Sequence, residues 1–385
     1  MRSRLKVLII GDGNSIYILN YIKNVLIPNN AIVFLYTGKN IRKEYLRFYE
    51  ENNTILLYSS IKNPFIQKIP KIRGFLDFSY GLYQIYKNRS YDAIHVHFAD
   101  RRSCCIAYLC RKFTRKEICS FWGSDLLRSN DHQVQKLKTY LDRCDIISIE
   151  TQRMYNRIIN VFNHIYDNKI KTIRFGIETF DMIDNIKSLE DKKTSRAKLG
   201  MPAEKVIITI GYNASPYQQH LLMIKQLARI DPEILDRVFI VIQMTYGNSN
   251  MHYYEEVRNK IKAITNNFII FDKFMQEEDI ARLRVCTDIF IHGQTTDTLS
   301  ASFQEYIYAG AIILNGKWLK YKELEERGIK YIEYESFDEI PILMTNIISN
   351  LQNYKLSFFN NIDILRKFSS VQAVSQEWYN LYQVS

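Results

Sequence analysis

Several features that mark other classes of protein are missing from this sequence of 385 residues. Its apolar runs, such as 7–10, 206–210 and 238–242, have the length of a strand, and none approaches the roughly 20 residues of a membrane span. The six cysteines form no C-x-x-C pair and show no repeated spacing, which argues against a disulfide framework. Their mostly apolar surroundings predict reduced, buried thiols, and we expect a cytoplasmic protein.

Several short signatures are missing as well. The sequence has no internal repeat, no low-complexity segment and no nucleic-acid-binding motif. A dinucleotide fingerprint G-x-G-x-x-G beginning at Gly11 and Gly13 would need a glycine where Ile16 stands, which disfavours a nicotinamide enzyme. His95 and His97 share one side of a strand end without a convincing third ligand, so we expect no metal site.

The chain does have strand and helix patterns that alternate from end to end, with 46% hydrophobic and 24% charged residues. This alternation predicts an α/β protein with doubly wound parallel sheets, and the length suits two domains. We expect a Rossmann-like domain over 1–174, a linker over 175–200 and a second Rossmann-like domain over 201–350. A tail with a helical pattern, 351–385, follows.

The most informative segment is 297–310, because strand patterns at 287–292 and 311–314 flank it. A strand, a polar loop, a helix and a second strand make a βαβ unit, whose ligands bind at the carboxyl ends of strands and at helix N-termini. Amides near Ser300 would then face an anion such as a pyrophosphate. Glu305, one turn into the helix, would accept two hydrogen bonds from a ribose diol.

A purely local interpretation of the same residues is also open. Ser302 and Glu305 fit the S-x-x-E capping box, in which the glutamate caps its own helix. The local pattern alone does not choose between a ligand-binding carboxylate and a cap.

The spacing of Asp297, Glu305 and Gly310 resembles the E-x7-E…G signature of the group-one type of retaining glycosyltransferases, which have the GT-B fold. Other segments follow in the order that this family implies: the strand and glycine loop 7–15, the strand end 94–97, the motif 121–125, the crossover 173–177 and the strand 206–211. Segments 121–126 and 211–220 also resemble the bacterial fucosamine transferase of enterobacterial common antigen assembly, an inverting GT-B enzyme.

The resemblance implies two Rossmann-like domains that face a cleft, with the acceptor on the first, the nucleotide-sugar donor on the second, and a C-terminal helix that crosses back to the first domain. Glu305 would bind the donor ribose, and Asp297 the transferred sugar or its phosphate. The implied donor-binding residues are Gly211, Asn213, His220, Ser300, Ala301, Ser302 and Glu305. The implied acceptor-binding residues are Gly11, Asp12, Gly13, Asn14, Trp122, Gly123 and Ser124.

The stereochemical outcome decides whether a general base is needed. In an inverting enzyme, His97 or Asp125 would take the proton of the acceptor hydroxyl. In a retaining enzyme, a leaving phosphate oxygen can take it, and this is the outcome that we expect. The sequence has no Asp-x-Asp motif, which favours a metal-independent catalyst that stabilises the leaving diphosphate with amides and side chains. We therefore expect neither a cofactor nor a metal.

The chain departs from the family pattern at three positions. Asp297 is one methylene shorter than the usual glutamate, Tyr212 stands where an arginine is usual, and Trp122 stands where a histidine is usual. Charge compensation for a pyrophosphate would then come from helix N-terminal amides or from other side chains. The side chains that we consider for this role are His220, Arg101, Arg102 and Lys317.

The formal net charge is +11, and basic residues are dense over 62–116. Several aromatic residues lie among them, a combination that suits an anionic membrane surface. The alternative is an ordinary solvated helix face with its aromatic rings turned inward. The residues are Lys62, Phe65, Lys68, Lys71, Arg73, Phe75, Phe78, Tyr80, Tyr83, Tyr86, Lys87, Arg89 and the cluster 111–116.

The expected function is therefore transfer of a sugar, by a glycosyltransferase of the hexosyltransferase type, from a nucleoside-diphosphate sugar to a glycan acceptor in bacterial surface polysaccharide synthesis. The acceptor would be lipid-linked or lipopolysaccharide, and the protein would be peripheral on the inner face of the cytoplasmic membrane. Because the usual arginine and lysine are missing, a non-catalytic glycan-binding or partner subunit of the same fold stays open. A sugar-nucleotide epimerase is a weaker third option.

Overall fold

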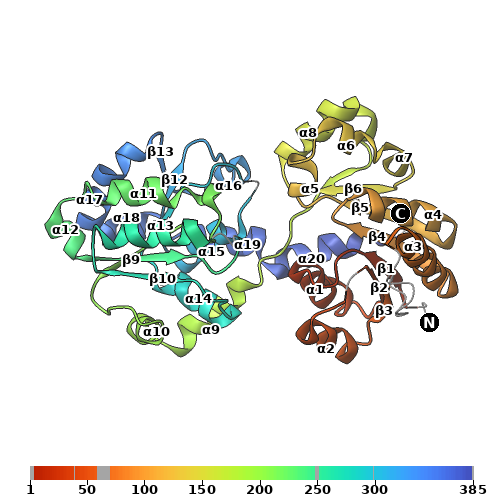
Figure 1. The fold of residues 1–385 in the computed structure, drawn as a ribbon, viewed down its shortest axis with the longest axis horizontal. Coiled ribbons are helices and arrows are strands. Elements are labelled where there is room, and N and C mark those ends of the chain that lie inside the picture. Colours follow the sequence, from red (N-terminus) through yellow and green to blue (C-terminus); the bar gives the residue numbers. More distant parts are fainter. Residues whose placement is uncertain (1–3, 39, 59–69, 248–250, 298, 384–385) are drawn as a thin grey trace. The chain divides into compact units, whose positions relative to one another are not determined.

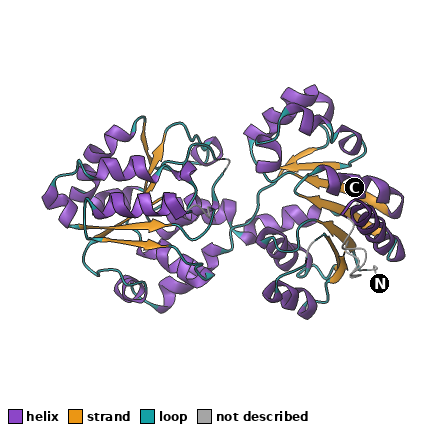
Figure 2. Ribbon diagram, in the orientation of Figure 1, coloured by secondary structure: helices purple, strands orange, loops and turns teal. Residues whose placement is uncertain are grey.

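The computed structural model describes residues 4–38, 40–58, 70–247, 251–297 and 299–383, apart from the side chains of 70–73. The chain divides into two compact units, drawn in Figure 1. Unit 1 comprises Met1–Gly176 and Val371–Ser385, and unit 2 comprises Ile177–Ser370. Each unit is an open sheet with helices packed on both faces (Figure 2).

The described strands of unit 1 are all parallel and pair in the order β3-β2-β1-β4-β5-β6-β7. The order reverses between β1 and β4, which is the switch point where doubly wound sheets bind ligands. The strands are β1 (Lys6–Ile10), β2 (Ile32–Thr37), β3 (Ile55–Tyr58), β4 (Tyr91–His97), β5 (Thr114–Ser120), β6 (Ile146–Ile149) and β7 (Ile170–Thr172).

The helices of unit 1 cover both faces of this sheet. They are α1 (Ile16–Tyr21), the π-helical turn η1 (Ile22–Leu26), α2 (Lys43–Glu51), α3 (Pro70–Lys87), α4 (Arg101–Cys110), η3 (Arg111–Phe113), α5 (Ser124–Leu127), α6 (Asp131–Gln135), α7 (Lys138–Leu141), α8 (Gln152–Phe162), η4 (Asn163–Tyr166) and α20 (Val371–Asn380).

Unit 2 repeats the architecture, with parallel strands in the order β10-β9-β8-β11-β12-β13 and a switch point between β8 and β11. The strands are β8 (Val206–Ile210), β9 (Val238–Gln243), β10 (Phe268–Phe271), β11 (Ile289–His292), β12 (Ile312–Gly316) and β13 (Ile332–Tyr334). The helices are α9 (Thr179–Leu189), α10 (Lys192–Lys198), η5 (Pro216–Gln218), α11 (His220–Leu227), α12 (Pro232–Asp236), α13 (Met251–Lys262), α14 (Glu277–Cys286), α15 (Ala301–Ala309), α16 (Lys322–Glu325), η6 (Phe337–Glu339), α17 (Ile340–Ser349), α18 (Leu351–Ser357) and α19 (Asn361–Ser369).

The apolar strand runs form sheets because both of their faces are buried. In β1, Leu8 and Ile10 enter one core cluster, whereas Val7 and Ile9 enter the cluster on the opposite face. Successive side chains of a strand point to opposite faces, so a strand covered by helices on both sides needs a continuous apolar run. The predicted α/β class with doubly wound parallel sheets is confirmed.

The C-terminal helix α20 packs in unit 1, as the resemblance implied. The Trp378 indole donates to the carbonyl of Arg174 at 2.5 Å, and the Tyr382 hydroxyl lies 2.7 Å from Nδ1 of His95. Both Trp378 and Tyr382 are buried, so the segment that begins at Val371 completes the core beside β4 and β1.

The domain boundaries differ from those expected. The segment 175–200, expected as a linker, forms α9 and α10, which belong to unit 2. Phe180 and Ile183 of α9 are buried in its core, and Arg196 of α10 makes an ion pair with Asp288 at 2.6 Å. Residues 351–370 also stay with unit 2, so that only 371–385 return to unit 1. The charged sequence of 189–196 did not indicate α10, because the buried side of this helix includes the paired Arg196.

Candidate functional site

The carboxyl edge of the unit 2 sheet brings together most of the residues that the sequence assigned to a donor. Gly211 follows β8, Asp297 lies in the loop after β11, and Ser300 to Glu305 begin α15. These elements flank the switch point of the sheet, which is the place expected for a ligand of such a fold.

Glu305 is the best-defined carboxylate at this edge. Its Oε2 accepts from Nε of Arg284 at 2.9 Å, and its Oε1 accepts from the hydroxyl of Thr179 at 3.0 Å. The side chain is only 9% exposed, and that of Arg284 is 2% exposed. Since a carboxylate has about four acceptor positions, these two bonds leave capacity for two more. The carboxylate is therefore oriented before any ligand arrives.

Arg284 was not identified from the sequence, although it is the buried cation of this edge. It comes from α14 and also donates to Gln243 at 2.9 Å and to the Tyr306 hydroxyl at 2.7 Å, with its guanidinium 4.2 Å from the centroid of the Tyr306 ring. Burial alone would lower the pKa of Arg284, but Tyr306 and Glu305 raise it above the ordinary value. A second terminal nitrogen lies 3.4 Å from the hydroxyl of Ser302 at the start of α15.

The capping-box interpretation of Ser302 and Glu305 is wrong. Ser300 is the N-cap residue of α15, and its hydroxyl accepts from the amide of Phe303 at 3.2 Å. Glu305 turns away from the helix end toward Arg284 instead. The helix starts two residues earlier than the capping-box pattern required, because Ser300 outcompetes Ser302 as the cap.

Asp297 lies at the same edge in a different environment. Its Oδ2 accepts from the Tyr321 hydroxyl at 2.8 Å and lies 3.9 Å from Nε2 of His292. Burial lowers the pKa of His292, although Asp297 acts in the opposite sense. The side chain of Asp297 is 13% exposed. The Tyr321 phenol holds Asp297 from one side. Burial and the neighbouring Asp297 both raise the pKa of Tyr321, so the phenol stays protonated.

An amide network that the sequence did not reveal fixes the loop before Asp297. Gln218 donates to Gln294 at 2.7 Å and accepts from the amide of Tyr212 at 3.2 Å, while the Tyr212 hydroxyl also donates to Gln294. The Trp318 indole donates to the carbonyl of Gln294 at 2.8 Å. Tyr212, which stands where the resemblance led us to expect an arginine, therefore helps to build the loop.

Gly211 is required by its surroundings. Its φ is +65°, and a Cβ atom there would lie 2.4 Å from Nε2 of His220. Burial lowers the pKa of His220 to about 3, so this histidine is neutral near pH 7 and does not supply the positive charge considered above. Lys317, another residue considered for that role, pairs with Glu335.

Asn213 connects this loop to the end of β9. Its Oδ1 accepts from the amide of Ser215 at 2.9 Å, and its side chain hydrogen-bonds to Tyr246. Tyr246 is 54% exposed and interacts electrostatically with Arg284 and Glu305. An exposed ring thus stands beside the buried ion pair, although no sequence motif marked it.

The carboxyl edge of the unit 1 sheet brings together the residues assigned to an acceptor. A Cβ at Gly11 would lie 3.2 Å from the carbonyl oxygen of His97, so the β1 loop passes directly over the end of β4. Asp12 accepts from the amide of Asn14 at 3.0 Å, and Asn14 in turn accepts from the amide of Arg42 at 2.7 Å.

The rest of that loop is fixed in the same way. The Gly13 amide donates to the hydroxyl of Thr37 at 3.1 Å, and its carbonyl accepts from the Tyr49 hydroxyl at 3.1 Å. The backbone and polar side chains of 11–14 therefore mainly stabilise the conformation of their own turn. This structural role accounts for the two glycines.

Asp125 joins the loop after β4 to the loop after β5 through hydrogen bonds. Its Oδ2 accepts from the amide of Ala99 at 2.9 Å, and its Oδ1 accepts from the amide of Trp122 at 2.9 Å. Burial raises its pKa to about 6, against the effect of these backbone hydrogen bonds. The motif continues through Gly123, with φ +105°, into Ser124 and the short helix α5. A role for Asp125 as a general base stays a prediction.

His97 is buried, and neither ring nitrogen has a hydrogen-bond partner in the described part of the chain. Burial lowers its pKa to about 3, so the ring is neutral near pH 7. It lies against Tyr21 and Trp122, with ring centroids at 4.5 and 5.8 Å. A role for His97 as a general base also stays a prediction.

The basic and aromatic stretch of unit 1 lies partly outside the described residues, since Lys62, Phe65 and Lys68 fall there and the side chains of Lys71 and Arg73 are not described. Of the described rings, Phe78 packs on the core. Phe75, Tyr83 and Tyr86 are 69%, 56% and 46% exposed, so not all the rings turn inward.

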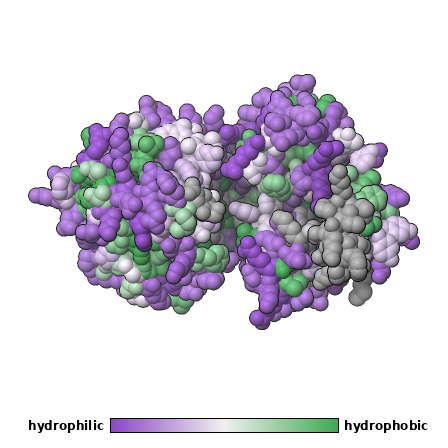
Figure 3. Space-filling view, in the orientation of Figure 1, coloured by the Kyte–Doolittle hydropathy of each residue, from purple (hydrophilic) through white to green (hydrophobic). Residues whose placement is uncertain are grey.

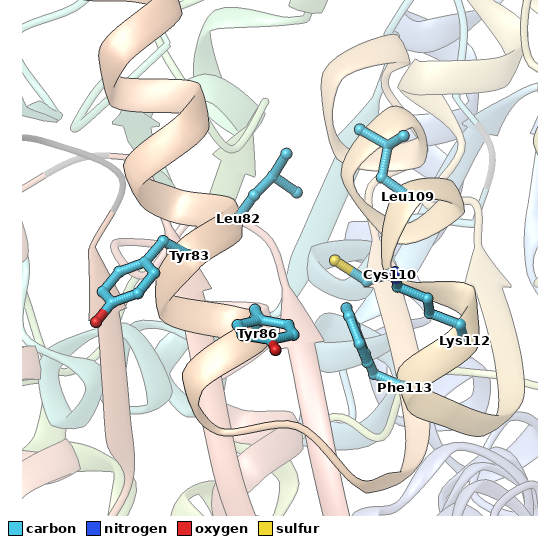
Figure 4. A pocket seen from close by; sticks show the side chains of 7 residues that line it. All are labelled: Leu82, Tyr83, Tyr86, Leu109, Cys110, Lys112 and Phe113. Carbon is cyan, nitrogen blue, oxygen red and sulfur yellow. The ribbon is translucent and has the colours of Figure 1, made fainter.

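Of these exposed rings, Tyr83 and Tyr86 border a shallow cavity of about 340 Å³ between α3 and the α4–η3 segment (Figure 4). Tyr86 and Phe113 meet edge to face across it at 5.4 Å, and Lys112 lies beside Phe113. The face drawn in Figure 3 is otherwise largely hydrophilic, with scattered apolar patches.

The described residues contain neither a cluster of metal ligands nor a helix suited to cross a membrane. No three His, Cys, Asp or Glu side chains there gather closely enough to hold a metal ion. None of the helices described is both long and apolar enough to cross a membrane.

Comparisons with known proteins agree on the fold. No protein-family model matches the chain. A candidate glycosyltransferase of Bacillus subtilis (strain 168), YtcC, is 23% identical over 194 residues, which cover 48% of this chain and 47% of that protein. The match thus spans about half the length of each.

Solved structures match over nearly the whole chain. A glycosyltransferase from Rickettsia africae ESF-5 has a TM-score of 0.75 and 14% identity, covering 99% of this chain and 98% of that one. HepE of Anabaena, solved with UDP and glucose, has a TM-score of 0.72 and 14% identity over 98% and 99%. WaaG, a glycosyltransferase involved in lipopolysaccharide biosynthesis, has a TM-score of 0.66 and 10% identity over 98% and 100%. The predicted GT-B fold is confirmed, whereas the likeness to the fucosamine transferase stays a prediction.

Proposed function

We propose that this protein, which has the GT-B fold, is a glycosyltransferase that uses a nucleoside-diphosphate sugar. The observation that carries the proposal is the oriented carboxylate of Glu305 at the switch point of unit 2, fixed by Arg284 and Thr179. Two of its acceptor positions stay available, which matches what a ribose diol needs.

The donor would extend from Glu305 along the start of α15. The partial positive charge of a helix N-terminus favours a diphosphate there, and Ser302 is tied to the guanidinium of Arg284. Asp297, held by Tyr321, would contact the transferred sugar or its phosphate. We name UDP as the first donor nucleotide to test, because structural neighbours of this chain bind UDP and UDP-glucose.

The acceptor would occupy the carboxyl edge of the unit 1 sheet. We propose a glycan attached to a lipid or to lipopolysaccharide, transfer with retention of configuration without a metal, and a place on the inner face of the cytoplasmic membrane. The support for the membrane is the set of exposed rings on α3 with Lys112 beside them, a combination suited to an anionic lipid surface.

A thermal-shift series tests the donor site. UDP, GDP, ADP and CDP are added to the full-length protein, and a ligand at about a hundred times its dissociation constant should raise stability by about 2.7 kcal/mol. We expect one of these nucleotides to shift the unfolding temperature of the wild type, and Glu305→Gln to abolish the shift.

Glu190 offers a matched control within the same unit. It pairs with Arg282 at 2.8 Å, with both side chains 5% exposed. Glu190→Gln should therefore lower stability in a similar way yet keep the nucleotide shift. If both variants keep the shift, or if no nucleotide binds the wild type, the proposed donor site is wrong.

A non-catalytic subunit is the second candidate, because the guanidinium of Arg284 is already engaged by four side chains. Incubation with UDP-glucose separates the possibilities. Slow release of UDP indicates a transferase that uses water as acceptor, and conversion of the sugar without release indicates an epimerase. Binding with neither reaction indicates a non-catalytic protein.

A further inference from the structure

The carboxyl edge of unit 1 carries a cluster of aromatic rings that is distinct from the donor residues of unit 2. Trp122 is its centre, with Tyr17 at 5.2 Å, Phe175 at 5.5 Å and Phe98 at 6.1 Å between ring centroids. All three meet Trp122 at steep angles of 68°, 72° and 88°. Tyr17 and Phe98 are 51% and 39% exposed, so the cluster opens to solvent.

Phe98 occupies an unfavourable backbone conformation. It follows β4 directly at the switch point, and its φ is +67°, a region that bulky side chains rarely adopt. Its amide donates to the carbonyl of Ser120 at 3.2 Å, and its own carbonyl accepts from the amide of Asp100 at 2.8 Å. The fold thus forces a phenylalanine into a strained turn that leaves its ring partly exposed, and such strain concentrates at functional sites.

Polar groups without partners lie at the base of the same cluster. Both ring nitrogens of His97, which is 1% exposed, and the indole nitrogen of Trp122 lack a hydrogen-bond partner in the part of the chain that the structure describes. Buried polar groups are normally paired, so an unpaired set needs an explanation such as a ligand or a water molecule. Neutral His97 can both donate and accept, which suits the hydroxyl groups of a sugar.

Asp125 holds the two ring-bearing loops in register. It binds the amide of Ala99, next to Phe98, and the amide of Trp122. One buried carboxylate therefore joins the backbones of the two loops that carry the Phe98 and Trp122 rings. Rigid aromatic surfaces of this kind bind ligands at low entropic cost.

We propose that a pyranose ring of the acceptor packs with its apolar C–H face against the partly exposed aromatic cluster of Tyr17, Phe98 and Trp122, which we call the platform. The buried nitrogens of His97 and of the Trp122 indole would reach its hydroxyl groups through an ordered water molecule. This inference rests on the proposed function and deepens it, because it names a sugar ring as the part of the acceptor that unit 1 recognises. The platform consists of unit 1 residues, and we assign it to recognition of the acceptor and not to the transfer step.

Saturation-transfer NMR with the full-length protein tests the platform without knowledge of the natural acceptor. The probes are millimolar methyl α-glucopyranoside, methyl β-glucopyranoside and methyl β-galactopyranoside, with uridine as a comparison. We expect transfer to the ring C–H protons of at least one glycoside. Tyr17→Ala and Phe98→Asn should weaken its binding by about tenfold or more, as the loss of a stacking ring typically does.

The variants are chosen so that folding and binding can be separated. Asparagine tolerates a positive φ, so Phe98→Asn removes the ring and keeps the turn. Phe359→Ala is the matched control, because Phe359 is 63% exposed in unit 2 and belongs to neither edge described above. It should keep the glycoside signal.

Each result bears on the proposal. Absence of transfer to every glycoside in the wild type, or an unchanged signal in both platform variants, would overturn it. A uridine signal that Tyr17→Ala removes would show that the platform holds a base, and would also overturn it. The UDP thermal shift is measured separately, so a failed donor site and a failed platform give different results.

Discussion

Replacing Arg284 with methionine removes its guanidinium and keeps much of its apolar volume. In the variant Arg284→Met, the carboxylate of Glu305 would stay 9% exposed with the Thr179 hydroxyl as its remaining described partner. Three further side chains would lose a donor, namely Gln243, Ser302 and Tyr306. Breaking a buried ion pair from one side leaves an uncompensated charge, which costs about 3–5 kcal/mol.

For a unit of this size, each kcal/mol lowers the unfolding temperature by about 2–4 °C, so Arg284→Met should lower it by about 6–20 °C. The double variant Arg284→Met/Glu305→Leu removes both charges, and such paired replacements are often neutral or stabilising. We expect most of the lost stability to return in the double variant. Nucleotide binding should not return, because the carboxylate that we propose to bind the ribose is gone.

The assay is urea and thermal unfolding of the full-length protein, with the UDP shift measured on each variant. Arg229→Met is the matched control: Arg229 pairs with Asp338 at 2.6 Å, but the two side chains are 55% and 70% exposed. An exposed pair contributes about 0–1 kcal/mol, so this control should change little. The reasoning is refuted if Arg284→Met costs less than about 1 kcal/mol, or if the double variant still binds UDP.

Two further predictions concern stability. Gly211→Ala should destabilise unit 2 and abolish nucleotide binding, because the residue has a φ of +65° and the new Cβ would lie 2.4 Å from Nε2 of His220. Gly310→Ala is the control, because Gly310 has a φ of +95° but open space around it. In chemical unfolding this control should show only the conformational cost of about 1–2 kcal/mol. Burial raises the pKa of Glu117 to about 7 from an ordinary 4.5, so the folded state keeps a proton that the unfolded chain has lost. The free energy of unfolding should therefore fall as the pH rises from the ordinary pKa of 4.5 to about 7. Glu117→Gln should make the urea midpoint depend less on pH between pH 5 and 8. Equal pH slopes in the wild type and the variant would contradict the assignment.

Local patterns in the sequence were sufficient for the fold class. The apolar runs at 7–10 and 206–210 became central strands of the two sheets, because a strand covered on both faces needs an unbroken apolar run. The βαβ unit around 297–310 was also predicted correctly, as β11, α15 and β12. Turn-forming glycines marked the loops after β1 and β8 for the same local reason, since a close backbone approach at Gly11 and a positive φ at Gly211 leave no room for a side chain.

The partners of Glu305 could not be predicted from the sequence. It pairs with Arg284, 21 residues away, because α14 and α15 pack together on one face of the sheet. Nothing in the sequence distinguishes this arginine among 52 basic residues. The amide network of Gln218 and Gln294 joins positions 76 residues apart and has no local signal either.

The sequence by itself determined the alternation of strands and helices and where glycine is needed, because burial periodicity and backbone sterics act over a few residues. The exception is 175–200, which was expected as a linker and forms α9 and α10. Only the tertiary structure decided which polar groups are paired, which titratable groups are neutral and which rings stay exposed. His97 shows the difference: neighbouring residues predicted its position at a strand end. Its pKa is lowered by burial, and its ring nitrogens lack a hydrogen-bond partner among the described residues, where the rings of Tyr21 and Trp122 lie against it. His97 ends β4, Trp122 follows β5 and Tyr21 ends α1, so these residues meet only after the chain has folded.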